Sequence, residues 1–362
     1  MDLSKDNQIK RQLLKLIING NFPPESKLPP IRTLAKDFGV SISTIQKVIK
    51  TLKSDGYVES LPGSGVVITT NPQQKKSSNK IAILYPVPTV NYLEGDLYPK
   101  PIIDALKKKI LKFGYELVPC PLAKIKPWDL LEHIIDLDPA GIIFFEVNSD
   151  MVILELSELG LPTISIDVDL TRYGIPSVIP DKMYSMFELT NHLIDKGHQY
   201  IKFIHCPHYH KIGGKLFYEQ IDENMLHGYR MAMLNSKLTV SVDNFYSKSP
   251  SFDLTNKVSK IFHKKNSPTA IICESDFTTR IIIKIITDAG LKIPDDISLV
   301  GIGKSDEEFS PGEKITSIKL DLKKMGDIAG KFLLDTLNDS EISVQRSIVP
   351  TKIIYNQSIK KI

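Results

Sequence analysis

Two apolar repeats at helical spacing, separated by a glycine, constrain the fold of this chain more than any other feature. The first repeat has intervals of three and four residues and consists of Ile31, Leu34, Ala35 and Phe38. The second consists of Ile45, Val48, Ile49 and Leu52. Such spacing places each set on one face of a helix. Gly39 predicts the end of the first helix, because a residue without Cβ readily adopts the left-handed backbone of a tight turn.

A β-hairpin is predicted directly after the second helix. Gly56 ends that helix, residues 57–61 and 66–68 are strand-like, and Pro-Gly-Ser-Gly at 62–65 predicts the turn between them. An amphipathic helix upstream contains Ile9, Leu13, Leu16, Ile17 and Phe22. This order is typical of a winged helix-turn-helix, a module that binds DNA. Similar helical patterns also occur in domains that do not bind DNA, so the pattern alone leaves that alternative open.

The second helix of the pair offers polar side chains to a DNA major groove. Ser41 is a good N-cap for it, and its polar sides carry Ser43, Thr44, Gln46, Lys47 and Lys50. The turn of the hairpin is small enough for its backbone to approach a phosphate, and it contains Gly63, Ser64 and Gly65. Residues 1–79 hold twelve Lys and Arg against six Asp and Glu. That balance favours binding to phosphates.

Three separated motifs in this region resemble the DNA-binding domain of the GntR-family transcription regulators. They are Leu-Pro-Pro-Ile-Arg at 28–32, Val-Ser-Ile-Ser-Thr-Ile at 40–45, and Gly-Ser-Gly at 63–65. The resemblance implies that Arg32, Thr44 and Gly63 contact DNA.

Two positions depart from the GntR pattern. Ile42 and Gln46 stand where the family often has Arg. We therefore expect an operator that differs from the common family sites, and Gln46 could pair with an adenine edge.

Composition is that of an ordinary globular protein. Of its residues, 42% are hydrophobic and 24% are charged. The length of 362 residues is sufficient for two or three domains. It has no apolar run of membrane length and no signal-peptide core at its start, so we expect it to be cytoplasmic. Cys120, Cys206 and Cys273 form no CxxC pair and are most simply buried thiols.

A change of architecture follows a polar linker at residues 71–79. Apolar strand-like segments lie at 81–87, 140–147, 162–168, 200–206, 269–275 and 297–303. Helical patterns lie between them, at 101–114, 184–197 and 277–290. Apolar strands alternating with helices predict parallel sheets covered on both faces, and the number of strands favours two α/β lobes.

Motifs along this second part resemble the effector domain of the LacI/GalR regulators, which shares the periplasmic-binding-protein fold. They are Asp181, His192-Leu193-Ile194, Gly197-His198, Gly228-Tyr229-Arg230, Pro268-Thr269-Ala270-Ile271, Asp276, residues 293–301, residues 315–318, and Met325-Gly326. The resemblance implies an α/β fold of two lobes with parallel sheets, and a small-molecule cleft between the lobes.

The expected domain organisation follows from these two resemblances. We expect a winged helix-turn-helix domain at 1–70, a linker at 71–79, and an effector-binding and dimerisation domain at 80–362. The first lobe would comprise about 80–197 and 295–320. The second lobe would comprise about 198–294 and 321–362.

The residues that would grip an effector depart from the family pattern. Met225 stands where the family has an Arg, Ser275-Asp276 replaces an Asn-Asp pair, and residues 301–304 lack the acids of Gly-Tyr-Asp-Asp. Either the effector differs, or other residues replace the missing ones. The candidate effector-binding residues are Asp276, Asp169, Glu274, Ser275, Met225, Arg280, His205 and Trp128. Each of them could instead be structural.

Neither a cofactor nor a catalytic centre is predicted. His205, His208 and His210 lie close together in sequence, but loop histidines are common and we predict no metal site. The segment 211–215 has a Gly pair without the spacing of a P-loop. There is no nucleophile elbow, HExxH motif or convincing acid pair. We therefore expect that the protein is not an enzyme.

The combined interpretation is a DNA-binding transcriptional regulator controlled by a small ligand. We expect a homodimeric repressor on a two-fold operator, with a sugar or sugar derivative as effector. The alternatives are a two-lobed sugar-binding protein, or a sugar-acting enzyme, with an attached DNA-binding domain. A DNA binder that has lost its effector is also compatible with the altered pocket.

Overall fold

The structure is a computed structural model. It describes residues 9–10, 12–13, 16–17, 21–54, 56–61, 65–69, 78–86, 93, 98–206, 209–212, 215–218, 222–244, 261, 267–303, 308–338 and 345–362. The chain divides into two compact units. One comprises residues 1–86, 107–176 and 330–345, and the other comprises 87–106, 177–329 and 346–362.

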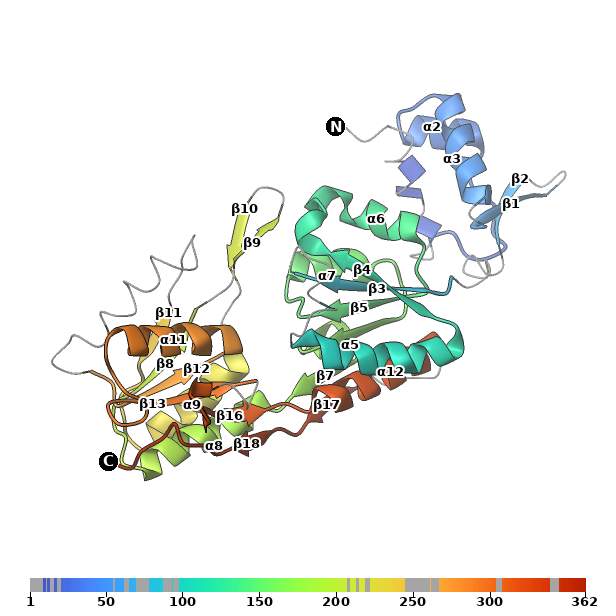
Figure 1. The fold of residues 1–362 in the computed structure, drawn as a ribbon. Coiled ribbons are helices and arrows are strands. Elements are labelled where there is room, and N and C mark those ends of the chain that lie inside the picture. Colours follow the sequence, from blue (N-terminus) through green and yellow to red (C-terminus); the bar gives the residue numbers. More distant parts are fainter. Residues whose placement is uncertain are drawn as a thin grey trace. The chain divides into compact units, whose positions relative to one another are not determined.

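The N-terminal domain contains the predicted helix pair and wing (Figure 1). Helices α2 (Ile31–Asp37) and α3 (Ile42–Ser54) are joined through Gly39, whose φ of 62° is left-handed. Strands β1 (Val58–Leu61) and β2 (Gly65–Ile68) pair antiparallel. Their shared apolar core includes Ile9, Leu13, Ile17, Leu34, Ile45, Leu52, Val58 and Ile68. The segment before α2 joins the wing through a bridge between Lys27 and Val67.

The first large sheet has the strand order β17-β7-β6-β5-β3-β4. Its strands are β3 (Lys80–Tyr85), β4 (Glu116–Pro121), β5 (Gly141–Phe145), β6 (Thr163–Ile166), β7 (Ser177–Pro180) and β17 (Arg346–Val349). The registers of β3 with β4 and β5, of β5 with β6, and of β17 with β7 are all parallel. The central strands β3 and β5 are buried or nearly so along their length, as expected for strands covered on both faces.

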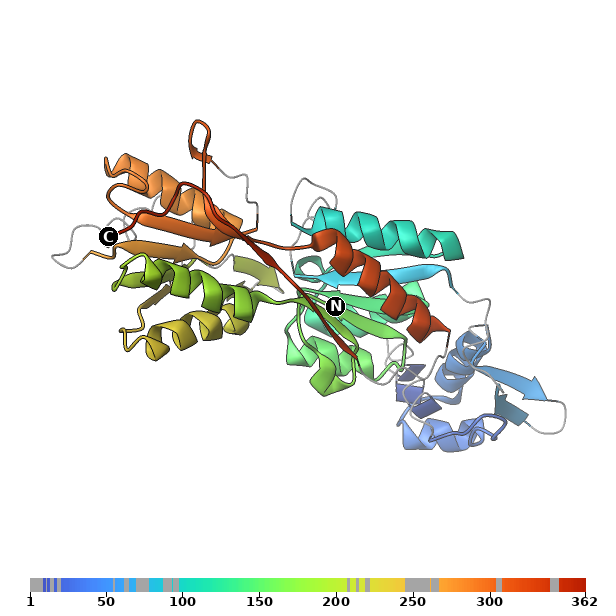
Figure 2. The same ribbon diagram turned by 90° about the horizontal axis from the view of Figure 1, so that it is seen from below.

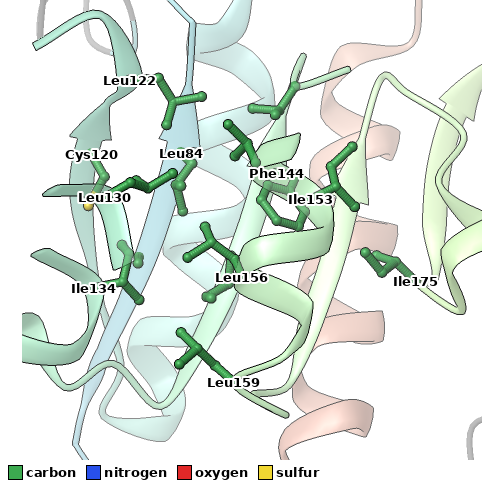
Figure 3. Close-up of a cluster of buried hydrophobic side chains, with 14 of the residues drawn as sticks. Leu84, Cys120, Leu122, Leu130, Ile134, Phe144, Ile153, Leu156, Leu159 and Ile175 are labelled. Atoms are coloured by element: carbon green, nitrogen blue, oxygen red, sulfur yellow. The ribbon is translucent and has the colours of Figure 1, made fainter. Parts of the chain in front are cut away.

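Helices cover both faces of this first sheet. Helices α6 (Leu130–Leu137) and α7 (Asp150–Ser157) pack on one face, where Ile134, Ile153 and Leu156 meet Phe144 of β5 (Figure 3). Helices α5 (Pro99–Ile110) and α12 (Leu322–Leu337) lie side by side on the other face (Figures 1 and 2). They approach closely because α12 has glycine at 326, against the carbonyl oxygen of Ile102.

The second large sheet has the order β11-β8-β12-β13-β16-β18. Its strands are β11 (Val242–Asn244), β8 (Ile201–His205), β12 (Ala270–Cys273), β13 (Ser298–Ile302), β16 (Thr316–Lys319) and β18 (Lys352–Ile354). All registered neighbours are parallel except the edge strand β18, which is antiparallel to β16. Helices α8 (Lys182–Asp195) and α9 (Glu223–Asn235) pack on one face. Helix α11 (Asp276–Asp288) packs on the other.

Gly228 and Tyr229 of α9 pack this helix against the neighbouring elements of the second sheet. A Cβ on Gly228 would collide with the backbone of α8 at Met183, so glycine allows the two helices to touch. The buried Tyr229 hydroxyl accepts a hydrogen bond from the N–H of Ser241 at 2.9 Å. Its proton lies within reach of the carbonyl oxygens of Ile201 and Ser241, at 2.9 and 3.0 Å. This side chain therefore ties α9 to the start of β8.

Smaller elements complete the described chain. Two antiparallel hairpins are formed by β9 (Tyr209–Ile212) with β10 (Lys215–Tyr218) and by β14 (Glu308–Ser310) with β15 (Glu313–Lys314). Short 3-10 helices are η1 (Leu111–Phe113), η2 (Leu122–Lys124), η3 (Pro127–Asp129) and η4 (Thr171–Tyr173). In the described part of the chain, we find no helix with the length and apolar character needed to cross a bilayer.

The α/β class with parallel sheets is confirmed, but the expected division into lobes differs from the structure. Residues 295–320 are expected in the first lobe, yet β13 and β16 pair within the second sheet. Residues 321–362 are expected in the second lobe, yet β17 pairs with β7 in the first sheet. The reason is that the chain crosses between the sheets more than once, and strand-like composition does not reveal which sheet a strand joins.

Candidate functional site

The recognition helix α3 buries one face and leaves the predicted DNA-facing residues accessible. Ile45, Val48, Ile49 and Leu52 are buried, whereas Ser43, Gln46 and Lys47 are exposed. Ser41 lies just before the helix and caps it, because its hydroxyl accepts a hydrogen bond from the N–H of Thr44 at 3.1 Å. The Ser41 hydroxyl also lies 2.7 Å from that of Ser43 and 2.8 Å from that of Thr44. The helix therefore begins in a cluster of small hydroxyl groups.

The other predicted DNA contacts lie around this helix. Arg32 is exposed near the start of α2, and Gly65 is exposed at the start of β2 with a φ of 90°. Gly63 and Ser64 lie outside the described residues, so their contact with DNA stays a prediction. The first turn of α3 has no acidic residue, which suits the approach of a phosphate to a helix N-terminus.

Several of the predicted effector residues meet at the carboxyl ends of three adjacent strands in the second sheet. His205 is the last residue of β8, and Glu274 directly follows β12. Because Ile204 and Cys273 are partners in the parallel register, the next residue of each strand also lies side by side. The Glu274 carboxylate contacts Nδ1 of His205, and both side chains are largely buried. This contact fixes the orientation of the His205 imidazole.

The neighbouring cysteines do not supply reactive thiolates. Burial, with a smaller contribution from the charge of Glu274, raises the pKa of Cys206 to about 12. Burial also raises the pKa of Cys273 well above its usual value. Both thiols therefore stay protonated at neutral pH, and the sequence-based expectation of buried thiols is confirmed for Cys120, Cys206 and Cys273.

Asp276 begins α11 at the same edge of the second sheet. Ser275 caps this helix by accepting a hydrogen bond from the N–H of Thr278 at 3.2 Å. The Asp276 carboxylate lies against Gly303, the residue that follows β13. A Cβ at Gly303 would be 2.6 Å from both Asp276 oxygens, and the φ of Gly303 is 107°. Because Gly303 has no side chain, the Asp276 carboxylate can occupy the position where a Cβ would otherwise lie.

Other predicted effector residues lie elsewhere. Met225 is 2% exposed within the apolar core under α9, which gives it a packing role. Arg280 is exposed one turn along α11 from Asp276. Trp128 is 58% exposed in η3, with the Lys126 ammonium 5.9 Å from its ring centroid.

Asp169 lies after β6 and shortly before the 3-10 helix η4. Its carboxylate accepts hydrogen bonds from the N–H of Thr171 at 3.0 Å and from the Thr171 hydroxyl at 2.7 Å. This local role accounts for its position after the strand, whether or not it also meets a ligand.

Two carboxylates that the sequence analysis missed lie at the carboxyl edge of the first sheet. Glu146 follows β5 and Asp167 follows β6, and both have left-handed backbones with φ of 55° and 74°. The Glu146 N–H donates to the carbonyl oxygen of Ile166 at 3.1 Å, which holds the two loops together. Ligands of open α/β sheets bind at this edge. Position directly after an apolar strand is the sequence signal that could have identified both residues.

The described ranges hold no cluster of three or more His, Cys, Asp or Glu arranged to bind a metal. His208 and the side chain of His210 lie outside the described part of the chain.

Comparison with known proteins accounts for both parts of the chain. Residues 5–68 match the family model of bacterial regulatory proteins of the gntR family, and residues 190–359 match that of the periplasmic binding protein-like domain. The chain therefore combines an N-terminal gntR-family domain with a periplasmic binding protein-like domain. The combination predicted from the sequence motifs is thereby confirmed.

Two relatives align with this chain over nearly its whole length. The arabinose metabolism transcriptional repressor of Geobacillus stearothermophilus is 24% identical over 98% of each chain. Catabolite control protein A of Priestia megaterium is 22% identical over 99% of this chain and 98% of its own. The first of these relatives is named as a transcriptional repressor and the second as a control protein.

Solved structures show the fold. The lac repressor dimer bound to operator and the anti-inducer ONPF has a TM-score of 0.64 at 17% identity, over 80% of this chain and 97% of that one. A complex of the transcriptional regulator CelR with cellobiose has a TM-score of 0.61 at 18% identity, over 91% of this chain and 100% of that one.

Proposed function

We propose that this regulator is a repressor whose affinity for operator DNA is lowered by an uncharged sugar. The observation that carries the proposal is the pairing of an open recognition helix with a second sheet whose carboxyl edge gathers Asp276, Glu274 and His205. The first feature suits DNA and the second suits a small polar ligand. The protein would act in the cytoplasm, where operator DNA lies.

The DNA-binding half of the proposal rests on the chemistry of the exposed residues. Arg32 and Lys47 carry charges that pair with phosphates, and Thr44 and Ser43 are small enough to hydrogen-bond to phosphate or base edges. Gln46 can bond both N6 and N7 of an adenine. Two copies of the chain would bind a two-fold operator, because operator symmetry mirrors the symmetry of a dimer.

The proposal that the effector is an uncharged sugar rests on the acidic side chains at the carboxyl edges of the two large sheets. Asp276 and Glu274 lie at that edge of the second sheet, and Glu146 and Asp167 lie at that edge of the first. Carboxylates accept hydrogen bonds from sugar hydroxyls and repel phosphate. With the buried Met225 in place of an Arg, an uncharged sugar fits better than a sugar phosphate.

The relatives indicate which sugars to try first. Two of them are named for arabinose metabolism. Structural neighbours hold D-xylulofuranose, ribose and cellobiose. We propose a pentose as the first class of probe.

Sugar binding would act on DNA affinity through a conformational equilibrium. A ligand shifts such an equilibrium only by its differential affinity for the two states. Typical coupling free energies of about 1–3 kcal/mol change affinity by about 5- to 150-fold. This range is sufficient for a repressor to leave its operator when the sugar is present.

The DNA-binding half is tested by replacing both Arg32 and Lys47 with Ala. An operator selected from a random-sequence library is titrated with the protein at several salt concentrations. We expect weaker binding and a salt dependence reduced by about one unit for each phosphate that the variant no longer neutralises. Lys324→Ala, an exposed lysine of α12, is the matched control and should change neither quantity. Equal affinity and equal slope in the double variant would exclude the assigned surface.

The effector half is tested by thermal unfolding with arabinose, ribose, xylulose and their phosphates. We expect the uncharged sugars to raise the unfolding temperature and the phosphates to have no effect. Asp276→Asn should lose the stabilisation by sugar while keeping operator affinity. Full stabilisation of this variant would remove Asp276 from the binding site.

A further inference from the structure

The recognition helix has one large apolar side chain on its exposed surface. Ile42 is the first residue of α3 and is 46% exposed, whereas Ile45 and Ile49 of the same helix are at most 7% exposed. Ile42 belongs neither to the buried core of this domain nor to the partly buried residues packed against it. Its side chain therefore contributes little to the folding of the domain.

The surroundings of Ile42 are polar. The other exposed residues of α3 are Ser43, Gln46, Lys47, Lys50, Lys53 and Ser54. The hydroxyl of Ser41 holds those of Ser43 and Thr44 within 2.8 Å beside it. On the helix surface, residues four apart are neighbours, so Ile42 stands next to Gln46.

Helix stability gives no reason for an isoleucine at this position. A β-branched residue has lower helix propensity than Ala, Lys or Glu, and an exposed apolar side chain gains nothing from water. The residues at the start of a recognition helix are the ones that reach base edges in the major groove. The apolar group that the major groove presents there is the C5-methyl of thymine.

We propose that Ile42 contacts the C5-methyl group of a thymine in the operator and so selects a T·A pair at one position of each half-site. This inference rests on the proposed function, since it needs α3 to lie in the major groove. It also explains the departure from the GntR pattern, because the Arg usual at this position would hydrogen-bond to guanine. Gln46 lies beside Ile42 and can hydrogen-bond to adenine, so the start of α3 would favour an A·T-rich sequence.

Deoxyuridine isolates the contact, because it lacks only the methyl group of thymine. In a selected operator, each thymine is replaced in turn by deoxyuridine, and affinity is measured by fluorescence anisotropy. We expect one position per half-site at which wild type loses about fourfold, which corresponds to about 0.8 kcal/mol for one buried methyl group. Ile42→Ala should bind the thymine and deoxyuridine operators equally at that position, because its side chain is too short.

Two further variants complete the experiment. Ile348→Ala truncates an isoleucine of matched exposure, 47%, in β17 and should keep the fourfold ratio. Ile42→Arg, used in a new selection from the random library, should exchange T·A for G·C at the same position and leave the others unchanged. Ile42→Ala removes no core packing, and an unchanged unfolding temperature will verify that the domain is intact.

The possible outcomes separate this inference from the proposed function. A fourfold ratio that persists in Ile42→Ala would assign the methyl contact to another residue and overturn the inference. Specific binding by wild type with no sensitivity to deoxyuridine at any thymine would also overturn it, and the proposed function would stand. A wild-type protein without sequence-specific binding would overturn both.

Discussion

Replacing Gly303 with Ala should displace the Asp276 carboxylate without disturbing the DNA-binding domain. The new Cβ would lie 2.6 Å from both carboxylate oxygens, far inside an ordinary contact of 3.4–4 Å. The carboxylate must then move by roughly 1 Å, because the backbone of the β13 loop is held by the hydrogen bond from the N–H of Gly303 to the carbonyl oxygen of Ile318. The left-handed φ adds a folding cost of about 1–2 kcal/mol.

The expected decrease in sugar affinity follows from the hydrogen bond that Asp276 would make. A hydrogen bond to a charged group contributes about 1.5–3 kcal/mol, so the dissociation constant should rise about 10- to 150-fold. Gly290→Ala is the matched control, because its φ of 74° imposes similar backbone strain while its Cβ would meet nothing within 4 Å. Calorimetric titration with the sugar that gives the largest thermal shift measures both variants. Equal sugar affinity in the two variants would refute the assignment of Asp276 to the binding site.

Three further predictions concern the stability of the fold. Asp222→Ala removes the N-cap of α9 and the partner of Lys182, 3.0 Å away, and should cost about 2 kcal/mol, or about 4–8 °C in unfolding temperature. Burial raises the pKa of Asp222, but the charge of Lys182 and the bonds from backbone N–H groups outweigh it and lower the pKa. The contribution of Asp222 is thus present above the usual carboxyl pKa and is lost as pH falls through the lowered value, so wild type and variant should converge in acid. Gly326→Ala in α12 meets a backbone carbonyl of α5 and should lower the free energy of unfolding by about 1–3 kcal/mol in a urea titration. Gly330→Ala, one turn further, is the control for this prediction, because its Cβ would meet side-chain atoms of Lys109 at 3.0–3.4 Å instead of a backbone carbonyl, and it should destabilise less than Gly326→Ala. Burial lowers the pKa of His198, so the unfolded state binds more protons and stability should fall as pH drops below about 6.5. A His198→Gln variant should show a smaller fall over the same pH range in thermal unfolding.

Local sequence patterns were sufficient to predict the elements of the DNA-binding domain. The apolar repeats that end at Phe38 and Leu52 lie on helices, and Gly39 has the left-handed backbone that its place between them requires. Helix and turn preferences depend on a few neighbouring residues, so they can be recognised in the sequence without knowledge of distant contacts. The assignment of strands to lobes was wrong because it depends on pairing between distant segments. For example, β13 and β16 lie beside β12 in the second sheet, and no local sequence pattern shows which strands become their neighbours.

The candidate site was predicted only in part, for a similar reason. Asp276 was proposed from the motif that resembles the LacI/GalR regulators, and Glu274 was proposed as a residue that could replace the missing ones. The sequence did not indicate that Glu274 meets His205, because that contact depends on the register of β8 and β12. Met225 was proposed from its place in a motif, whereas its burial follows from the packing of α9.

A single titration tests whether sugar binding lowers the affinity of the protein for its operator. Fluorescently labelled operator is titrated with the protein at fixed salt concentration, with and without a saturating uncharged pentose that stabilises the protein in thermal unfolding. We expect the dissociation constant for the operator to rise about 5- to 150-fold when the sugar is present. If this constant stays the same while calorimetry shows the sugar to be bound, the proposed control of DNA binding by sugar is wrong.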